Sequence, residues 1–310
     1  MEEKLLFIFN PNAGNGRAEK LLPKLKSTLR TRAHNIEIAV TGYTNHAYEL
    51  VKDQQKEFSK IIVVGGDGTL NEALNGCNEE FSAVLGVIPV GSGNDFAKTA
   101  GLTGSFEENI KNVTSENVFI RTIDFGELFY SVNETGSMIL RRFINSAGIG
   151  FDAVVSDKKN HVRNLRGLLQ YIVAVKKALK QFNNIEVHSN FDGAEDFGEK
   201  LLIAISNGKT YGGGIRVNPY AEVNDGLLDA CIINPLSVFR VAKDLPKFIT
   251  GKHEKLTEVR LFRFKEAELT IPASAYIHAD GEVISRNAKK ILIKINSRNL
   301  KFIFVPGRNI

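Results

Sequence analysis

The chain has 310 residues, which is long enough for two domains that each bury a core. Its 43% hydrophobic and 24% charged residues are typical of a soluble globular protein and exclude a largely disordered chain. The formal net charge of +5 suits anionic surfaces or phosphorylated ligands, but it does not indicate nucleic acid, and we expect no nucleic-acid partner.

The cysteine content and the N-terminus suggest a cellular location. Cys77 and Cys231 are far apart and lack metal-ligand spacing, so we predict neither a disulfide framework nor a zinc site. The N-terminal residues lack the features of a signal peptide, and no apolar run is long enough to span a bilayer. We therefore expect a cytoplasmic protein whose membrane contact is peripheral.

The N-terminal part alternates strands and helices. The predicted strands are 4–9, 36–41, 61–64 and 84–88, and the predicted helices are 17–32 and 45–58, with a further helix after the third strand. This order predicts a parallel sheet with helical crossovers. Ligands of such sheets bind beyond the carboxyl ends of the strands.

The segment 61–72, Ile-Ile-Val-Val-Gly-Gly-Asp-Gly-Thr-Leu-Asn-Glu, is the most informative part of the chain. Its strand has no polar position, as expected for a strand buried on both faces of a parallel sheet. The glycines let the backbone approach a ligand, and the following helix can present N–H groups to an anion. A carboxylate such as Asp67 beside a bound phosphate needs a cation to offset the repulsion between the two negative charges. Metal-bound nucleotide phosphate is therefore the first hypothesis. The alternative is a plain tight connection.

From about residue 117 the pattern changes to consecutive short strands. They are predicted at 118–124, 127–132, 139–145, 201–206, 227–233, 259–264, 268–271 and 291–295, with helices at 165–182 and 238–249. This pattern indicates a mainly antiparallel β domain. We predict domains at 1–124 and 125–299, and the last strand, within 300–310, fits either of them.

Four turns are candidates for a phosphate site, although neither of the commonest nucleotide-binding signatures is present. The turns 10–16, 41–44, 65–71 and 91–95 each follow a predicted strand and open a helix. Each can direct N–H groups or hydroxyls at one ligand. For a single turn a plain connection is favoured, but four turns on one sheet edge favour a ligand site.

Over residues 10–282 these motifs together resemble the diacylglycerol kinase and sphingosine kinase superfamily, specifically its bacterial diacylglycerol-kinase-like lipid kinases. The resemblance implies an α/β N-terminal domain with a parallel sheet, NAD-kinase/phosphofructokinase-like, and a mainly antiparallel β C-terminal domain. It also implies ATP as a substrate, with Ser92 at a position where the family has threonine. The residues then expected to bind ATP are Asn10, Thr41, Gly65, Gly66, Asp67, Gly68, Thr69, Leu70, Asn71 and Ser92.

Carboxylates in both halves are candidate Mg²⁺ ligands. The Asn224-Asp225-Gly226 turn offers one carboxylate and several carbonyls, which suit a hard cation, although a hairpin turn explains the same residues. The resemblance implies a structural Mg²⁺ held by Asp225 with main-chain oxygens near Glu222 and Leu227. For the Mg²⁺ of ATP the candidates are Asp67, Asp124 and Asp95, and Asp95 is placed third because an aspartate is favoured at a helix start in any case.

The segment 278–282, His-Ala-Asp-Gly-Glu, lies between two predicted strands and on its own is an ordinary turn. The resemblance implies that Glu282 is the catalytic residue, and we expect it to act as general base, with Asp67 as the second catalytic residue. Phosphoryl transfer depends mainly on alignment and charge neutralisation. The six histidines, His278 among them, show no metal pairing, and we interpret them as structural.

The sequence therefore predicts an ATP-dependent lipid kinase that transfers the γ-phosphoryl group to a lipid hydroxyl, with diacylglycerol as the first choice and phosphatidic acid as its product. The alternatives are a soluble small-molecule kinase of the NAD-kinase type and a nucleotide-binding regulatory protein without turnover. We expect the basic amphipathic helix 165–182 to pack against the core of its own domain and not to dock on a membrane. An exposed edge on the terminal strand would allow a homodimer.

Overall fold

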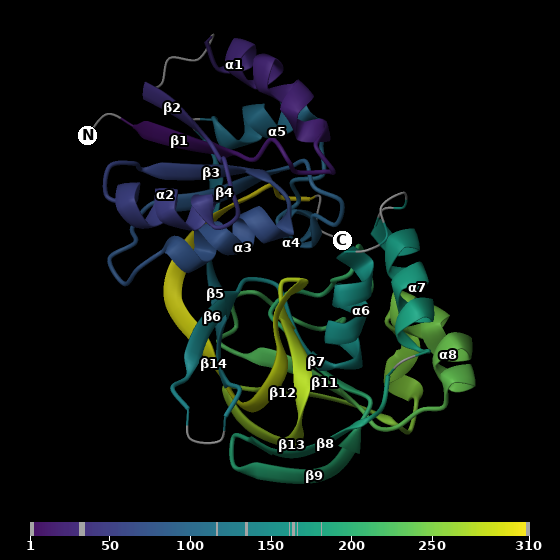
Figure 1. Cartoon of the computed structure of the whole chain (residues 1–310). Helices are drawn as coiled ribbons and strands as arrows, with labels where there is room; N and C mark the ends of the chain where they lie inside the picture. The colour runs from purple at the N-terminus through teal and green to yellow at the C-terminus, as the bar shows by residue number, and fades with distance from the viewer. Residues whose placement is uncertain are drawn as a thin grey trace. The chain divides into compact units, whose positions relative to one another are not determined.

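The structure is a computed structural model that describes residues 3–30, 35–115, 117–133, 136–160, 162, 165, 167–180 and 182–307. The chain divides into two compact units, residues 1–123 with 298–310 and residues 124–297 (Figure 1). Strands β5 (Phe119–Ser131) and β14 (Glu282–Phe304) each contribute residues to both units. The chain therefore passes twice between the units.

Unit 1 is an α/β unit built on a parallel sheet, in the order β2, β1, β3, β4 and the end of β14. Its other strands are β1 (Lys4–Phe9), β2 (Asn35–Val40), β3 (Lys60–Gly65) and β4 (Val84–Pro89). Its helices are α1 (Leu22–Arg30), α2 (His46–Gln54), α3 (Asp67–Gly76), α4 (Asp95–Thr99) and α5 (Phe106–Val113). Every residue of β3 is buried, as its uninterrupted apolar run predicts.

Several boundaries in unit 1 differ from the predicted ones. The helix expected over 17–32 begins with a 3₁₀ turn, Arg17–Leu21, before α1, and residues 31 and 32 lie outside the described residues. Pro23 is tolerated there because the first turn of a helix needs no intrahelical N–H donors. Helix α3 begins at Asp67, earlier than expected, because the Leu70 N–H bonds the Gly66 carbonyl at 3.0 Å.

Unit 2 is mainly antiparallel, in the strand order β12, β11, β10, β7, β13 and the start of β14. Its strands are β6 (Ile139–Phe143), β7 (Ser146–Gly150), β8 (Ile185–Phe191), β9 (Ala194–Lys200), β10 (Leu202–Ser206), β11 (Leu228–Ile233), β12 (Val259–Phe264) and β13 (Glu266–Ala279). Its helices are α6 (Phe151–Asn160), α7 (Gly167–Ala178), α8 (Val238–Thr250) and the 3₁₀ turn Lys252–Lys255. The predicted fold class is confirmed for both units.

Glycines account for two errors in the prediction of unit 2. The break expected between strands 118–124 and 127–132 is absent, because Gly126 lies inside the continuous strand β5. A Cβ on Gly126 would clash with the ring of Phe143, so this glycine permits close packing and makes no turn. Strand β7 was not predicted, because its glycine-rich segment lacks the apolar periodicity of a strand, and helix α6 was also not predicted.

The helices of unit 2 gather on one side of its sheet (Figure 1). An apolar cluster there joins buried residues of α6, α7 and α8 to strands β10 and β11. Helix α7 contributes Tyr171, Ala174, Val175 and Ala178, so it packs in the core as predicted. It is shorter than the predicted 165–182, and residues 166 and 181 lie outside the described residues.

The terminal strand is not an open edge. Phe302 of β14 lies opposite Leu85 of β4 in parallel pairing, and β14 also pairs with β13 and β5. The free edge on which the homodimer hypothesis depended is therefore not found at this strand. Among the described residues, no helix combines the length and the apolar character needed to cross a membrane.

Candidate functional site

Three of the four predicted turns in unit 1 contact one another. The side-chain amide of Asn10 donates to the Thr69 hydroxyl at 2.8 Å, which joins the turn after β1 to the start of α3. Gly14, at φ +62°, lies against the turn after β4, since a Cβ there would be 2.5 Å from the Val90 carbonyl oxygen. The turn after β2 ends on the same edge, with the Thr41 N–H bonding the Phe9 carbonyl at 2.9 Å.

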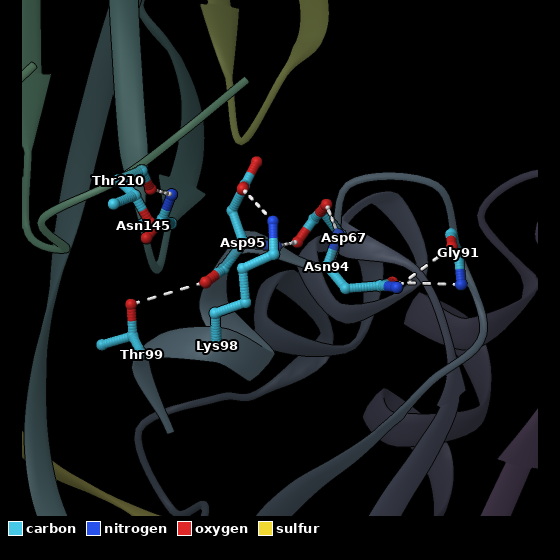
Figure 2. A network of polar contacts seen from close by, with 8 residues as sticks. All are labelled: Asp67, Gly91, Asn94, Asp95, Lys98, Thr99, Asn145 and Thr210. Atoms are coloured by element: carbon cyan, nitrogen blue, oxygen red, sulfur yellow. Dashed lines mark hydrogen bonds and ion pairs between the residues drawn. The ribbon is translucent and has the colours of Figure 1, made fainter. Parts of the chain in front are cut away.

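The carboxylate of Asp67 has backbone partners (Figure 2). It accepts the N–H of Asn94 at 2.7 Å and that of Asp95 at 2.8 Å, at the start of α4. An acid at a helix start is stabilised by the free N–H groups and the helix dipole. Two N–H donors therefore already stabilise the charge of Asp67, and a cation at this carboxylate stays a prediction.

Backbone proximity explains the glycines of two turns. A Cβ on Gly91 would lie 2.5 Å from the Cα of Gly66, and one on Gly93 would lie 2.7 Å from the Asp67 carboxylate. Asn94, which the sequence analysis did not single out, closes the turn: its side chain accepts the Gly91 N–H and donates to the Gly91 carbonyl, both at 3.0 Å. Its φ of 54° fits the left-handed preference of asparagine, which was the available signal.

Replacing Gly91 with alanine is expected to lower the free energy of unfolding by about 1–3 kcal/mol, because the two turns must move apart. Urea denaturation measures this change. Gly42→Ala is the matched control, since a Cβ at Gly42 has no neighbour within 4 Å. Equal stabilities for the two variants would contradict the proposed close packing of the turns.

The remaining unit 1 candidates lie at the same strand ends. Thr41 and Asn71 are buried, and Ser92 is half-buried in the turn after β4. Asp95 is buried and pairs with the Lys98 ammonium at 3.1 Å. This ion pair supplies Asp95 with a local partner, consistent with its third place among the magnesium candidates.

In unit 2 the Asp280-Gly281 turn connects β13 to β14. The Asp280 carboxylate accepts three backbone N–H groups, from Ile144, Asn145 and Ser146, each at 2.9 Å. Asp280 has a φ of 47°, and these bonds hold that strained conformation in place. Glu282 is the first residue of β14 and is exposed, so its carboxylate is accessible. This role of Asp280 was not predicted from the sequence.

A group of carboxylates in unit 2 includes the predicted metal ligands. Asp124 accepts the Gly226 N–H at 2.8 Å, and Asp225 accepts the Leu227 N–H at 3.1 Å. Burial raises the pKa of Asp124, and it raises the pKa of Asp229 to about 6, against the opposing charge of Arg263.

One oxygen each of Asp225 and Asp229 is buried without a hydrogen-bond partner, and the Arg263 guanidinium lies 3.6 Å from Asp225 Oδ2. Such crowding of partly unsatisfied carboxylates fits a bound cation. Within the described ranges no three His, Cys, Asp or Glu side chains form a metal-binding group. A cation here would therefore also need main-chain oxygens, as was expected around Glu222 and Leu227.

An apolar pocket opens among the helices of unit 2. Its cavity volume is about 40 Å³, and it is partly open to solvent. Its lining has no charged side chain and consists of Phe151, Tyr171, Val175, Leu201, Leu202, Tyr211, Ile215, Val217, Ile233, Leu236, Val241, Leu245 and Phe248. A pocket of this character suits a hydrocarbon chain.

Family models match almost the whole chain. Residues 4–128 match the Diacylglycerol kinase catalytic domain, and residues 145–303 match the YegS C-terminal NAD kinase beta sandwich-like domain. The chain belongs to the diacylglycerol-kinase-like family of lipid kinases. It is therefore a kinase, and membership implies ATP as phosphoryl donor and a lipid as acceptor. The resemblance inferred from the motifs is confirmed.

Individual relatives agree with this assignment. This kinase is 28% identical to the diacylglycerol kinase of Mycobacterium tuberculosis, covering 90% of this chain and 88% of the relative. It is 27% identical to the diacylglycerol kinase of Bacillus subtilis, covering 89% and 88%.

Solved structures show the same fold. A diacylglycerol kinase from Bacillus anthracis has a TM-score of 0.74 at 23% identity, with 98% of each chain covered. The NAD kinase of Archaeoglobus fulgidus, solved with ATP, has a TM-score of 0.54 at 16% identity, covering 98% of this chain and 95% of that one. The fold is thus shared with kinases that differ in acceptor.

Proposed function

We propose that this lipid kinase transfers the γ-phosphoryl group of ATP to the hydroxyl of diacylglycerol, giving phosphatidic acid. The observation that carries the proposal is the apolar pocket of unit 2, whose lining has no charged side chain and so suits a hydrocarbon group better than a charged acceptor such as NAD. The names of the two bacterial relatives point to the same acceptor.

In this proposal the predicted domains have separate tasks: residues 1–124 bind ATP and residues 125–299 bind the lipid. The connected turns of unit 1 support ATP binding at Asn10, Thr41, Ser92 and 65–71, because they follow the strand ends at one edge of the sheet, where the ligands of parallel sheets bind. Glu282 serves as general base, and its exposure keeps the carboxylate available to a lipid hydroxyl.

A panel of acceptors with γ-labelled ATP tests the proposal. The panel contains diacylglycerol, a sphingoid base and phosphatidylglycerol in mixed micelles, together with NAD in solution. Label in phosphatidic acid is the expected result. Turnover of another lipid at higher kcat/KM would overturn the choice of diacylglycerol, and turnover of NAD alone would overturn the lipid pocket as the acceptor site.

We also propose that Asp225, with main-chain oxygens near Glu222 and Leu227, holds a structural Mg²⁺, and that Asp67, Asp124 or Asp95 helps to hold the Mg²⁺ of ATP. The buried Oδ2 of Asp225, which has no hydrogen-bond partner, supports the first site. Bound there, the ion would neutralise carboxylates that otherwise repel one another.

Addition of MgCl₂ without nucleotide is therefore expected to raise the melting temperature, and Asp225→Asn should remove most of this rise. Ligand present at 100 times its Kd stabilises a fold by about 2.7 kcal/mol. Glu199→Gln, at an exposed position of β9, is the control for loss of one charge. A magnesium response that is the same in both variants would exclude Asp225 as a ligand.

Peripheral membrane contact and a cytoplasmic location belong to the same proposal. The start of α8 exposes Phe239 by 76% and Val238 by 57%, and α7 exposes Leu169 by 63%. Both helices also line the apolar pocket and carry exposed lysines, among them Lys176 and Lys243. Exposed apolar residues with basic neighbours suit an anionic lipid surface.

Phe239→Ser is expected to weaken binding to vesicles that contain anionic lipid and to raise KM for lipid presented on them, with kcat for a short-chain soluble lipid unchanged. Sedimentation with vesicles measures the binding. Phe197→Ser is the matched control, since Phe197 is 59% exposed on β9. Equal loss of binding in the two variants would contradict a specific role for α8.

A further inference from the structure

A buried polar network lies behind the Asp280-Gly281 turn. His278 of β13 and Asp152 in the first turn of α6 are 126 residues apart in the sequence, and their side chains are only 1% and 0% exposed. His278 Nε2 lies 2.8 Å from Asp152 Oδ2. Gly148 makes the approach possible, because a Cβ at that position would overlap both side chains.

The opposite nitrogen of His278 contacts the turn itself. The Gly281 N–H donates to His278 Nδ1 at 3.3 Å, so Nδ1 is an acceptor and Nε2 carries the proton that points to Asp152. His278 therefore bridges Asp152 and the peptide that directly precedes Glu282. This tautomer satisfies both ring nitrogens without a charge on the ring.

On its other side Asp152 is connected to the apolar pocket. The Tyr171 hydroxyl lies 3.4 Å from Asp152 Oδ1, and the Tyr211 hydroxyl also bonds this carboxyl. Burial raises the pKa of both tyrosines well above its usual value, so both hydroxyls remain protonated donors. The rings of the two tyrosines line the pocket.

We propose that His278 is a positioning residue for Glu282, and that the chain Tyr211–Asp152–His278–Gly281 makes the placement of Glu282 depend on what fills the pocket. The inference rests on the proposed function, in which the pocket holds the acyl chain and Glu282 is the base. An acyl chain that packs on the rings of Tyr171 and Tyr211 restrains the two hydroxyls. Because these hydroxyls bond Asp152, the acyl chain also restrains His278.

Contacts on both sides set the position of this turn. Asp280 and Gly281 both have positive φ, 47° and 83°, as in the two-residue hairpin turns that Asp-Gly pairs favour. The Asp280 carboxylate fixes one side through residues 144–146, and His278 holds the Gly281 N–H on the other. An error of about 1 Å in the placement of a catalytic group can lower a rate about 100-fold.

Two variants test the two contacts of His278, with Asp152 and with the Gly281 N–H, one at a time. His278→Gln can still donate to Asp152 but has no acceptor at the Nδ1 position, whereas His278→Asn keeps that acceptor but cannot reach Asp152. We expect His278→Gln to lower kcat about 10- to 100-fold, with KM for ATP unchanged. We expect His278→Asn to retain more activity on a short-chain lipid than on a long-chain one. His188→Gln, on strand β8, is the control.

The decisive readout is the dependence of kcat on acyl-chain length, measured with diacylglycerols of six to ten carbons per chain in detergent micelles. In the unmodified kinase kcat should rise with chain length. The rise should flatten in His278→Asn and in Tyr211→Phe, which removes only one hydroxyl and serves as the test if the histidine variants do not fold.

Unchanged kcat in the folded variants, or a change in lipid KM with an intact chain-length dependence of kcat, would show that the network is merely structural. If the unmodified kinase phosphorylates no lipid, the proposed function fails and this inference fails with it. If the unmodified kinase is active and only the variants give the unexpected result, this inference fails alone.

Discussion

Glu282→Gln is expected to reduce the rate of phosphoryl transfer about 100- to 10,000-fold, the usual contribution of general base catalysis. Glutamine keeps the size and the hydrogen-bonding capacity of the side chain but cannot accept the proton of the lipid hydroxyl. Glu282 is exposed at the first residue of β14, so its removal leaves no buried group unpaired, and the free energy of unfolding should change little.

ATP affinity provides the second readout for this variant. Because the proposed ATP-binding residues belong to unit 1, the Kd for ATP, measured by calorimetry, should stay within about twofold of the original value. The control is Glu268→Gln. Glu268 is also an exposed glutamate of unit 2 but lies on β13, and this variant should keep full activity. Near-normal turnover by Glu282→Gln would remove Glu282 from its proposed role.

Asp67→Asn is expected to weaken ATP binding about 10- to 100-fold, because it disturbs the turn 91–95. The Asp67 carboxylate accepts two backbone N–H groups at 2.7 and 2.8 Å, whereas an asparagine side chain would direct its NH₂ group at one of these donors. Loss of one hydrogen bond to a charged group costs about 1.5–3 kcal/mol. The measurement is the Kd for ATP, with the melting temperature measured in parallel.

The dependence of ATP affinity on free Mg²⁺ distinguishes this structural role of Asp67 from a role as a metal ligand. If Asp67 acts by fixing the turn, a tenfold increase in free Mg²⁺ should not restore the ATP affinity of Asp67→Asn. Recovery at high Mg²⁺ would instead assign the carboxylate to the metal of ATP. Asp53→Asn, an exposed position on α2, controls for the change in net charge and should bind ATP normally.

Much of the fold followed from local sequence patterns. The unbroken apolar run of β3 predicted a buried parallel strand, because a strand covered on both faces has no place for a polar side chain. Glycine was informative when it ended such a run, as at Gly65, but misleading inside a strand. Gly126 suggested a break because sequence alone does not show the ring of Phe143 against which it packs.

In the candidate site, too, local features could be predicted from the sequence and contacts between distant residues could not. Residues close together in a motif, such as Gly65 to Asn71 or the Asp280-Gly281-Glu282 turn, could be named from the sequence because turn chemistry is local. The roles of Asp67 and Asp280 could not, since their backbone partners lie 27 to 28 and 134 to 136 positions away. A hydrogen bond across such separations depends on the packing of whole strands.

Local sequence patterns were sufficient for the order of strands and helices in unit 1, the turns at its strand ends and the family, but they missed β7 and α6 in unit 2. Only the tertiary structure decided that Asp152 and His278 meet, and that thirteen residues spread from Phe151 to Phe248 enclose one uncharged pocket. The physical reason is that strand order and helix packing bring distant residues together. Neither composition nor periodicity records such contacts.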